Sequence, residues 1–407
     1  MPSEYLMNFD QQTFLKDYWQ KKPLLIKGGL AAWDNPITAD ELAGLALEEE
    51  VESRLIEAQP VIDSITKSQW SLEHGPFAEQ RFNSLGEKNW TLLVQAVDHY
   101  APEVAQLLNY FGFIPGWQID DVMVSYATKG GGVGPHYDRY DVFLVQGQGQ
   151  REWQIGQRCS KHTALQDGQA LSLLTEFNCE QSYTLSAGDI LYVPPYISHW
   201  GTALDNNCMT YSVGFRSPSQ AEMLGDYSDF MQDVLSEDDR FRDATLSASA
   251  AGAIDEQTID SLALMLSERL RDKKHLRHWF GRWASQTKYS VANTQDESIE
   301  NNNAEDLIIN DIDFNNTDLV ICRDSASRFY YIDENKKEGT QLLLFVNGRE
   351  IHLGGELEAL PDLLKASIKT LCNQQSFSAE QLQPWLNDPA NYTVLAELFE
   401  NGELYSE

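Results

Sequence analysis

A glycine-rich run that leads into a His-x-Asp pair constrains this chain more than any other feature. Four glycines within residues 130–134 come just before His136 and Asp138, and His199 follows much later in the chain. Two histidines and one carboxylate form the facial triad, which holds Fe(II) and leaves coordination positions open. Open positions let a co-substrate and dioxygen reach the metal. The sequence therefore predicts an oxygenase-type metal site with His136, Asp138 and His199 as its ligands.

The spacing of the ligands predicts how they are held. Side chains two residues apart point to the same side of a β-strand. We therefore expect His136 and Asp138 on one strand, facing the inside of a barrel, with Tyr137 facing the other way. His199 must come from another part of the barrel, beyond the apolar strand predicted at residues 190–193. The same ligands also bind Mn, Ni, Co or Zn, and these alternatives stay open at this point.

The region around the three ligands is rich in short strands. Apolar runs of four to eight residues alternate with turn residues here, a pattern typical of a barrel or a double-sheet jelly roll. The expected strands are Val122–Tyr126, Tyr140–Gln146, Arg151–Ile155, Ser182–Leu185, Ile190–Val193 and Met209–Phe215. The segments expected before them are a short helix and a strand within residues 14–27, a capped helix from Thr38 to about Glu49, and a helix over Trp90–Tyr110.

The second half of the chain is predicted to contain helices, a linker and a small mixed unit in place of the many short strands. Apolar residues at helical spacing predict helices over Ser219–Leu235 and Gln257–Ser285. Residues 286–316 are polar and typical of a linker. Strands and an Asn-Gly turn at 347–348 then predict a small winged-helix-like unit with helices over Leu360–Leu371 and Ser378–Trp385. The expected domains are a catalytic unit over 1–216, a helical region over 217–288, a linker over 289–316 and the C-terminal unit over 317–407.

Composition narrows the possible partners. The formal net charge is −32, which opposes direct binding to DNA and favours a basic protein partner. A local exception is a run of cations expected to form a solvated helix face: Arg269, Arg271, Lys273, Lys274, Arg277 and Arg282. The five cysteines lack metal-site spacing and suit reduced thiols. Neither a membrane-spanning run nor a secretory signal is recognisable, so we expect a cytoplasmic protein.

A co-substrate site can be predicted beside the metal. A keto acid such as 2-oxoglutarate chelates the metal at one end, and its far carboxylate needs a cation, best an arginine. Arg151 shares one face of its predicted strand with two apolar residues, where a charge is costly without a partner. Arg151 is therefore the candidate for this role. Ser125 and Tyr137 are candidate assisting hydroxyls, and Ser212 is a weaker one.

These motifs together resemble the JmjC branch of the cupin fold. Beyond the ligand motif, similarity to the bacterial ribosomal oxygenases extends over Tyr18–Pro23, Ser71–Phe77, Asn89–Val97, Gln118–Asp121, Tyr140–Phe143 and Tyr211–Arg216. The resemblance is to the branch that hydroxylates an arginine of large-subunit ribosomal protein number sixteen, and it implies the same substrate for this chain. The resemblance is strong over about residues 5–230 and faint in the last hundred residues.

The resemblance implies a fold, cofactors and site residues. It implies an α+β chain: a JmjC-type double-stranded β-helix, a helical region through which members dimerise, and a C-terminal winged-helix-like domain. It implies Fe(II), 2-oxoglutarate and dioxygen as cofactor and co-substrates. His136, Asp138 and His199 match the metal ligands, and Arg151 and Ser125 match the positions that hold the far carboxylate of 2-oxoglutarate. The expected product is arginine hydroxylated at its β-carbon.

Other functions stay open at this stage. A related JmjC enzyme hydroxylates a histidine of another ribosomal protein, and others demethylate lysine. A metal-binding cupin with non-redox chemistry is a second class. A ribosome-assembly factor without catalysis, acting through its acidic surface, is a third.

Overall fold

The computed structural model describes the chain over residues 5–30, 33–58, 70–167, 171–242, 252–289, 312–316, 318–336, 339–353 and 360–406. The chain divides into two compact units, residues 1–217 and 218–407. Most of the predicted linker, residues 290–311, lies outside the described residues. The finer division into four domains stays a prediction.

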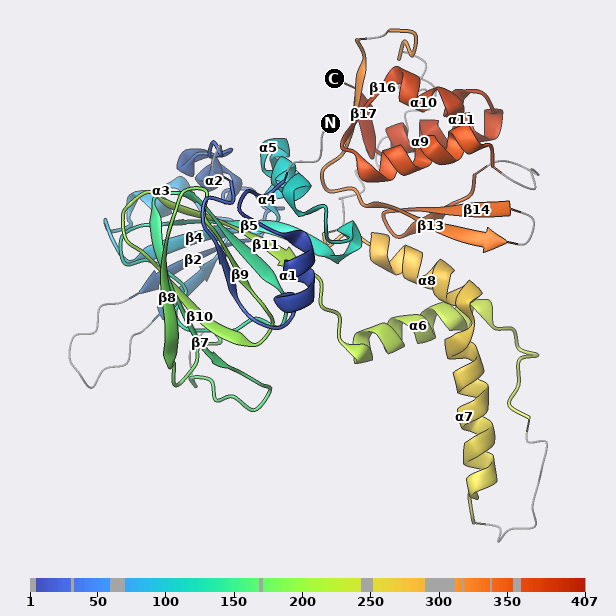
Figure 1. Cartoon of the computed structure of the whole chain (residues 1–407), viewed down its shortest axis with the longest axis horizontal. Coiled ribbons are helices and arrows are strands. Elements are labelled where there is room, and N and C mark those ends of the chain that lie inside the picture. Colours follow the sequence, from blue (N-terminus) through green and yellow to red (C-terminus); the bar gives the residue numbers. More distant parts are fainter. Residues whose placement is uncertain are drawn as a thin grey trace. The chain divides into compact units, whose positions relative to one another are not determined.

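The first unit is built on a large antiparallel sheet (Figure 1). Its eight strands lie in the order β1 (Leu24–Ile26), β9 (Ile190–Val193), β6 (Val142–Gln148), β11 (Cys208–Phe215), β5 (Ile119–Ala127), β4 (Trp90–Val94), β2 (Ser53–Ala58) and β3 (Trp70–His74). Several neighbours in this order are far apart in the sequence. The strand β11, for example, pairs with both β5 and β6.

A smaller sheet faces the large one and closes the barrel (Figure 1). It contains three antiparallel strands, in the order β10 (Ile197–Ala203), β7 (Gln150–Arg158) and β8 (Cys179–Ser186). A buried cluster between the sheets joins Trp153 and Leu185 of the small sheet to Leu144 and Leu191 of the large one. The predicted double-sheet barrel is confirmed. The strand β10, which carries His199, was not among the predicted strands.

Short helices cover the other face of the large sheet. They are α1 (Gln11–Asp17), α2 (Ala39–Leu45), α3 (Glu79–Asn83), α4 (Val97–Tyr100), α5 (Pro102–Ala105), and the 3₁₀ turns η1 (Gln106–Phe111) and η2 (Gly116–Gln118). Phe14 and Phe111 pack against Phe143 and Tyr192 of the sheet, with ring centroids 4.8–5.4 Å apart. This outer core fixes β6 and β9, the strands that flank the site described below.

Two of the predicted helices need correction. The capping box of Thr38 and Glu41 is present, but helix α2 ends at Leu45 rather than near Glu49. The helix predicted over Trp90–Tyr110 is wrong: residues 90–94 form strand β4, and short helices follow it. The strand β4 lies between β2 and β5, where apolar side chains are buried on both faces, so its sequence reads as a continuous run without a period of two.

The second unit begins with three helices, α6 (Gln220–Val234), α7 (Glu256–Arg271) and α8 (Lys273–Ser285). Tyr227 and Met231 of α6 pack against Trp279 of α8. The single helical run predicted over 257–285 is broken, because Asp272 leaves the helical conformation and its carboxylate caps α8 by accepting a hydrogen bond from the backbone of Lys274 (3.0 Å).

The rest of the second unit packs helices against two small sheets. Its elements are β12 (Val320–Arg323), β13 (Phe329–Lys336), β14 (Gly339–Val346), β15 (Arg349–Ile351), α9 (Asp362–Asn373), β16 (Ser376–Ser378), α10 (Ala379–Leu386), α11 (Pro389–Glu400) and β17 (Leu404–Ser406). The predicted tight turn at Asn347 and Gly348 is confirmed, since both residues have positive φ and join β14 to β15. The core of this unit is centred on the fully buried Trp385.

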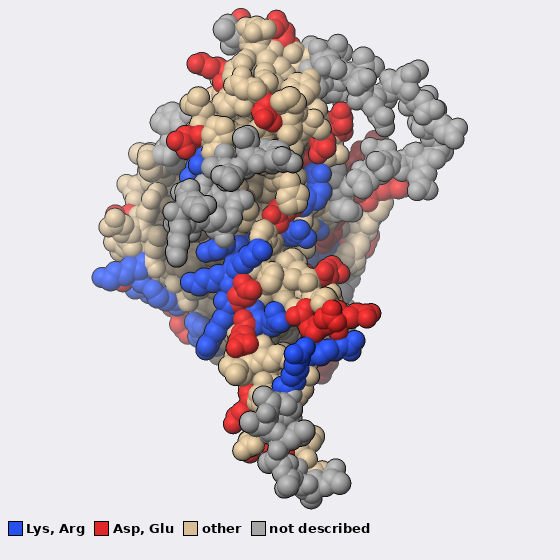
Figure 2. All heavy atoms as spheres, turned by 90° about the vertical axis from the view of Figure 1, so that its right-hand side faces the viewer, with Lys and Arg blue, Asp and Glu red and all other residues tan. Residues whose placement is uncertain are grey.

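Cations of the second unit gather on one face. Figure 2 shows a band of Lys and Arg side chains at the level of α8 and the end of α7. Of the six cations predicted for a solvated face of α7 and α8, Arg271, Lys273, Lys274 and Arg282 are exposed, whereas Arg269 and Arg277 are half-buried. Within the described residues, no helix is both long and apolar enough to cross a bilayer.

Candidate metal centre

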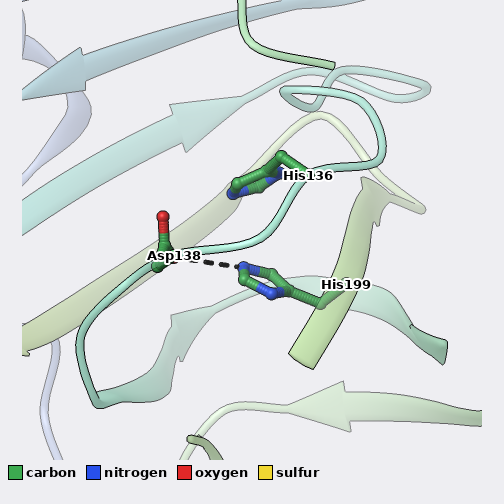
Figure 3. A group of neighbouring side chains, drawn as sticks. All are labelled: His136, Asp138 and His199. Carbon is green, nitrogen blue, oxygen red and sulfur yellow. Dashed lines mark ion pairs between the residues drawn. The ribbon is translucent and has the colours of Figure 1, made fainter. Parts of the chain in front are cut away.

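The structure brings the three predicted ligands together inside the mouth of the barrel. Figure 3 shows His136, Asp138 and His199 pointing toward one another. One ligand atom of each lies within 4.8 Å of the others, and His199 Nε2 lies 3.5 Å from Asp138 Oδ2. Ligand atoms that share one octahedral metal at about 2.1 Å lie about 3 Å apart when they are adjacent. Small side-chain adjustments therefore suffice to bring this donor set around one metal ion.

The ligands are held by an irregular segment against strand β10, and the predicted strand over 136–138 is wrong. His136 and His199 exchange two backbone hydrogen bonds (3.1 and 2.9 Å), which form an isolated bridge. The backbone N–H of Tyr196 donates to the carbonyl oxygen of Asp138 (2.7 Å). Because the turn that carries His136 and Asp138 is bonded directly to the chain that carries His199, the three ligands are fixed relative to one another.

The glycines before the ligands permit this close approach. A Cβ on Gly132 would lie 2.2 Å from the carbonyl oxygen of Gly201, two residues beyond His199 on β10. Gly134 has a φ of +88°, which a residue with a side chain adopts only at a cost. The role predicted for the glycine run is therefore visible in the contact between the loop and β10.

Both imidazoles are prepared to bind a metal through Nε2. The Nδ1 atom of His136 lies 2.9 Å from the carbonyl oxygen of Gly134, and the Nδ1 atom of His199 lies 3.1 Å from that of Ile197. A carbonyl oxygen only accepts, so Nδ1 carries the proton and the Nε2 lone pair is free. Burial, and next the neighbouring His136, lower the pKa of His199 to about 4. The neutral ring that a metal requires is therefore the stable form at neutral pH.

Arg151 lies in the interior of the barrel and lacks a counter-ion among the described residues. The predicted common face of Arg151, Trp153 and Ile155 is confirmed by their alternating burial along β7. Arg151 is 3% exposed, its Nε donates to the sulfur of Cys208 (3.4 Å), and its Nη2 finds no partner in the described part of the chain. An uncompensated buried cation is costly, so this site suits an anionic ligand.

The other predicted hydroxyls lie in different surroundings. Ser125 is buried on β5, on the same face as Ala127, which packs against Cys208. Its hydroxyl donates to the carbonyl oxygen of Thr210 (3.4 Å). The hydroxyl of Tyr137 donates instead to the carbonyl oxygen of Ser160 (3.2 Å), in the loop after β7. Tyr137 is thus engaged outside the barrel interior.

Ser212 lies on the barrel side of the large sheet, where it is paired with Met123 and Leu144. It is nearly buried, at 8% exposure. Within the described part of the chain its hydroxyl makes no hydrogen bond, so no contact links it to the three predicted ligands.

A cluster of carboxylates around Tyr140, beside the metal centre, was not predicted. The carboxylate of Asp138, followed by burial and the carboxylate of Asp121, raises the pKa of Tyr140, while Arg54 opposes this effect. Tyr140 is 42% exposed, so solvent reaches part of its side chain. Asp121 is itself held by the side-chain amide of Gln95 (2.7 Å). Only the Asp120-Asp121 pair at the start of β5 could have indicated this cluster in the sequence.

Comparison with known proteins agrees with this geometry. Residues 106–223 match the JmjC domain family, and residues 268–405 match the ROXA-like winged helix family. The ribosomal protein uL16 3-hydroxylase of Escherichia coli is 38% identical over 291 residues, which are 71% of this chain and 74% of that protein. The chain belongs to the JmjC-domain ribosomal oxygenases. The predicted JmjC cupin fold with a C-terminal winged helix is therefore confirmed, although the winged-helix match begins at residue 268, before the predicted boundary at 317.

Solved structures of a family member extend this likeness to the whole chain. The X-ray structure of E. coli YcfD matches with a TM-score of 0.82 and 31% identity, covering 99% of this chain and 100% of that one. The structure of YcfD in complex with cobalt and 2-oxoglutarate matches with a TM-score of 0.81 and 32% identity, over 99% and 100% of the two chains. A member of this ribosomal oxygenase family thus binds a divalent metal and 2-oxoglutarate.

Proposed function

We propose that this protein is an Fe(II)- and 2-oxoglutarate-dependent oxygenase that hydroxylates an arginine of ribosomal protein uL16 at its β-carbon. The observation that carries the proposal is the pairing of the His136, Asp138 and His199 cluster with the uncompensated Arg151 in one barrel. The first suits a metal and the second suits the far carboxylate of a keto acid. The relative that is named for uL16 hydroxylation supports the substrate.

Each residue has a role in this proposal. His136, Asp138 and His199 hold the metal and leave positions open for the co-substrate. Arg151 orients the co-substrate by pairing with its far carboxylate, with Ser125 as a further hydroxyl on the barrel side of β5. The metal, when bound, would supply the chemistry that divides dioxygen between two reactions: one oxygen atom oxidises 2-oxoglutarate to succinate and carbon dioxide, and the other is inserted into a C–H bond of the substrate. Trp153, whose ring centroid lies 5.8 Å from that of His199, helps to exclude water from the centre.

The cluster of carboxylates around Tyr140 supports a basic substrate side chain. Tyr140, Asp121 and Asp138 lie close enough for the two carboxylates to raise the pKa of the phenol. A guanidinium that enters there meets negative charge and an aromatic ring, both of which attract it. The net charge of −32 would also speed the encounter with a basic ribosomal protein.

Iron is the proposed metal because two imidazoles and one carboxylate with open positions are typical of non-haem Fe(II) oxygenases. Substrate in the ribosome also implies a cytoplasmic protein. We further propose a homodimer through the helical region. Helix α7 has no buried residue in the described chain, and its apolar side chains remain uncovered: Ile259, Leu262, Leu264, Leu266 and Leu270.

The test is hydroxylation of a synthetic arginine-containing loop from the organism's own uL16. The purified protein is incubated with the peptide, Fe(II), ascorbate and 2-oxoglutarate, and the product is read by mass spectrometry. We expect a gain of about one oxygen mass on arginine. The Asp138→Ala variant should yield none, because the metal loses its only carboxylate ligand.

The other outcomes separate the alternatives. Turnover of 2-oxoglutarate without peptide modification would keep the oxygenase and reject this substrate, and a histidine of another ribosomal protein would be tested next. Neither turnover nor modification would favour a non-redox cupin or an assembly factor. Full activity of Asp138→Ala would reject the proposed metal centre.

A further inference from the structure

The guanidinium of Arg151 contacts the sulfur of a cysteine rather than a carboxylate. Its Nε donates to Cys208 Sγ (3.4 Å), whereas its Nη2 has no partner among the described residues. Cys208 is fully buried on β11 and packs with Ala127 and Ala203, and Ala203 is the strand partner of Arg151 on β10. Cys208 therefore lies directly beside the site proposed for the far carboxylate of the co-substrate.

The sulfur is itself held by a buried amide. Gln146 on β6 is fully buried, and its Nε2 lies 3.4 Å from Cys208 Sγ. The same amide donates to the backbone carbonyl oxygens of Gln148 (2.8 Å) and Met209 (3.1 Å), and Gln146 Oε1 accepts from the hydroxyl of Thr210 (3.2 Å). An amide has only two N–H donors, and the two carbonyl oxygens lie closer to Nε2 than the sulfur does. These bonds fix Gln146 in place, and the sulfur of Cys208 packs against it.

This network occupies an irregularity in the pairing of β6 with β11. Met209 pairs with Gln148 and Thr210 pairs with Gln146, so Gly147 between them has no partner in the ladder. The side chain of Gln146 bonds to both strands at this point. Bulges of this kind commonly redirect a side chain next to an active site. Here the bulge aims the amide at Cys208.

We propose that Cys208, held by Gln146, is a positioning residue that sets the place and the available charge of Arg151 for the 2-oxo dicarboxylate. The inference rests on the proposed function, because it assumes that Arg151 binds the co-substrate. A thiol is a weak acceptor, so it orients the guanidinium without neutralising it. A carboxylate at this position would pair with Arg151 and compete with the co-substrate.

This reasoning gives the substitutions at one position different expected effects. Cys208→Ala removes the acceptor and frees Arg151 to recede, which should weaken 2-oxoglutarate binding about tenfold. Cys208→Ser restores a short acceptor and should stay within about threefold of the wild type. Cys208→Asp supplies an internal anion and should weaken binding by a hundredfold or more. The exposed Cys179 of strand β8, in the same unit, provides the matched control Cys179→Ala, which should change nothing.

The measurement is calorimetric titration of the full-length, cobalt-loaded protein with 2-oxoglutarate, and then with 2-oxoadipate, which is one methylene longer. In Cys208→Ala the preference for the shorter acid should decrease, because a receding Arg151 leaves room for the longer one. A general loss of stability would not produce this change. Melting curves and cobalt affinity, measured for every variant, show which variants keep the fold. If Cys208→Ala does not fold, the comparison of Cys208→Ser with Cys208→Asp tests whether Cys208 positions Arg151.

Two results would overturn the proposal, and they differ in what else they reject. If Cys208→Asp binds 2-oxoglutarate like the wild type while Arg151→Ala does not, Cys208 has no positioning role and the proposed function stands. If Arg151→Ala also binds normally, then Arg151 is not the co-substrate residue, and that part of the proposed function fails together with this inference.

Discussion

Replacing Gly132 with alanine tests whether contact between the glycine-rich loop and β10 shapes the metal centre. The added Cβ would lie 2.2 Å from the carbonyl oxygen of Gly201. Unbonded carbon and oxygen atoms rarely approach closer than about 3.2 Å, so the loop and the strand must separate by about 1 Å. The loop carries His136 and Asp138, and the strand carries His199. The substitution therefore moves His136 and Asp138 away from His199.

The expected loss can be estimated from the tolerance of metal sites. Ligand distances are held to within about 0.2 Å, and disturbance of the groups that orient ligands typically costs tenfold to a hundredfold in metal affinity. Gly132→Ala should therefore weaken cobalt binding by about 1.4–2.7 kcal/mol. Titration calorimetry of the metal-free protein with Co²⁺ measures this directly.

A matched glycine substitution serves as the control. Gly44 lies in helix α2, and a Cβ there would meet no atom within 4 Å in the described structure. Gly44→Ala should leave cobalt affinity unchanged and should not lower the melting temperature. Wild-type cobalt affinity in a folded Gly132→Ala protein would refute the argument, because the ligands would then tolerate the displacement that the contact demands.

Two further predictions concern stability. In the metal-free protein the pKa of His199 is lowered from 6.5 to about 4. Between these two pH values the unfolded chain binds a proton at His199, whereas the folded chain does not. The contribution of the neutral His199 to the free energy of unfolding is complete above about pH 6.5 and decreases by about 3 kcal/mol as the pH falls to about 4. Urea denaturation at a series of pH values should show this decrease, and the His199→Gln variant should show a smaller one. The fully buried Trp385, whose Nε1 donates to Ser367 Oγ (2.9 Å), anchors the second unit. Trp385→Ala should cost about 3–5 kcal/mol in urea denaturation, whereas truncating Leu363, which is 75% exposed, should cost little, and equal costs would contradict this account of the core.

Features that depend on neighbouring residues could be predicted from the sequence alone. The capping boxes at Thr38 and Ser378 and the turn at Asn347 form as expected, since each involves contacts within three residues. The alternating burial from Arg151 to Ile155 follows from strand periodicity. The clustering of His136, Asp138 and His199 could be predicted as well, because few residue types bind a metal and the order of these three along the chain is characteristic.

Features that depend on distant segments could not be predicted in this way. The run Trp90–Val94 reads as a helix in isolation and becomes a strand because β2 and β5 bury both its faces. The prediction that His136 and Asp138 lie close together is confirmed, but the strand that was expected to hold them is absent. An irregular segment bonded to β10 holds them instead.

The sequence by itself thus determined which residues carry the chemistry, and the tertiary structure decided how they are held. Backbone bonds to β10, more than fifty residues away in the chain, fix the ligand segment. The contact of Arg151 with Cys208 likewise joins strands that are neighbours only after the barrel closes. Local periodicity carries no information about such pairings, because they are selected by the burial of the whole barrel core.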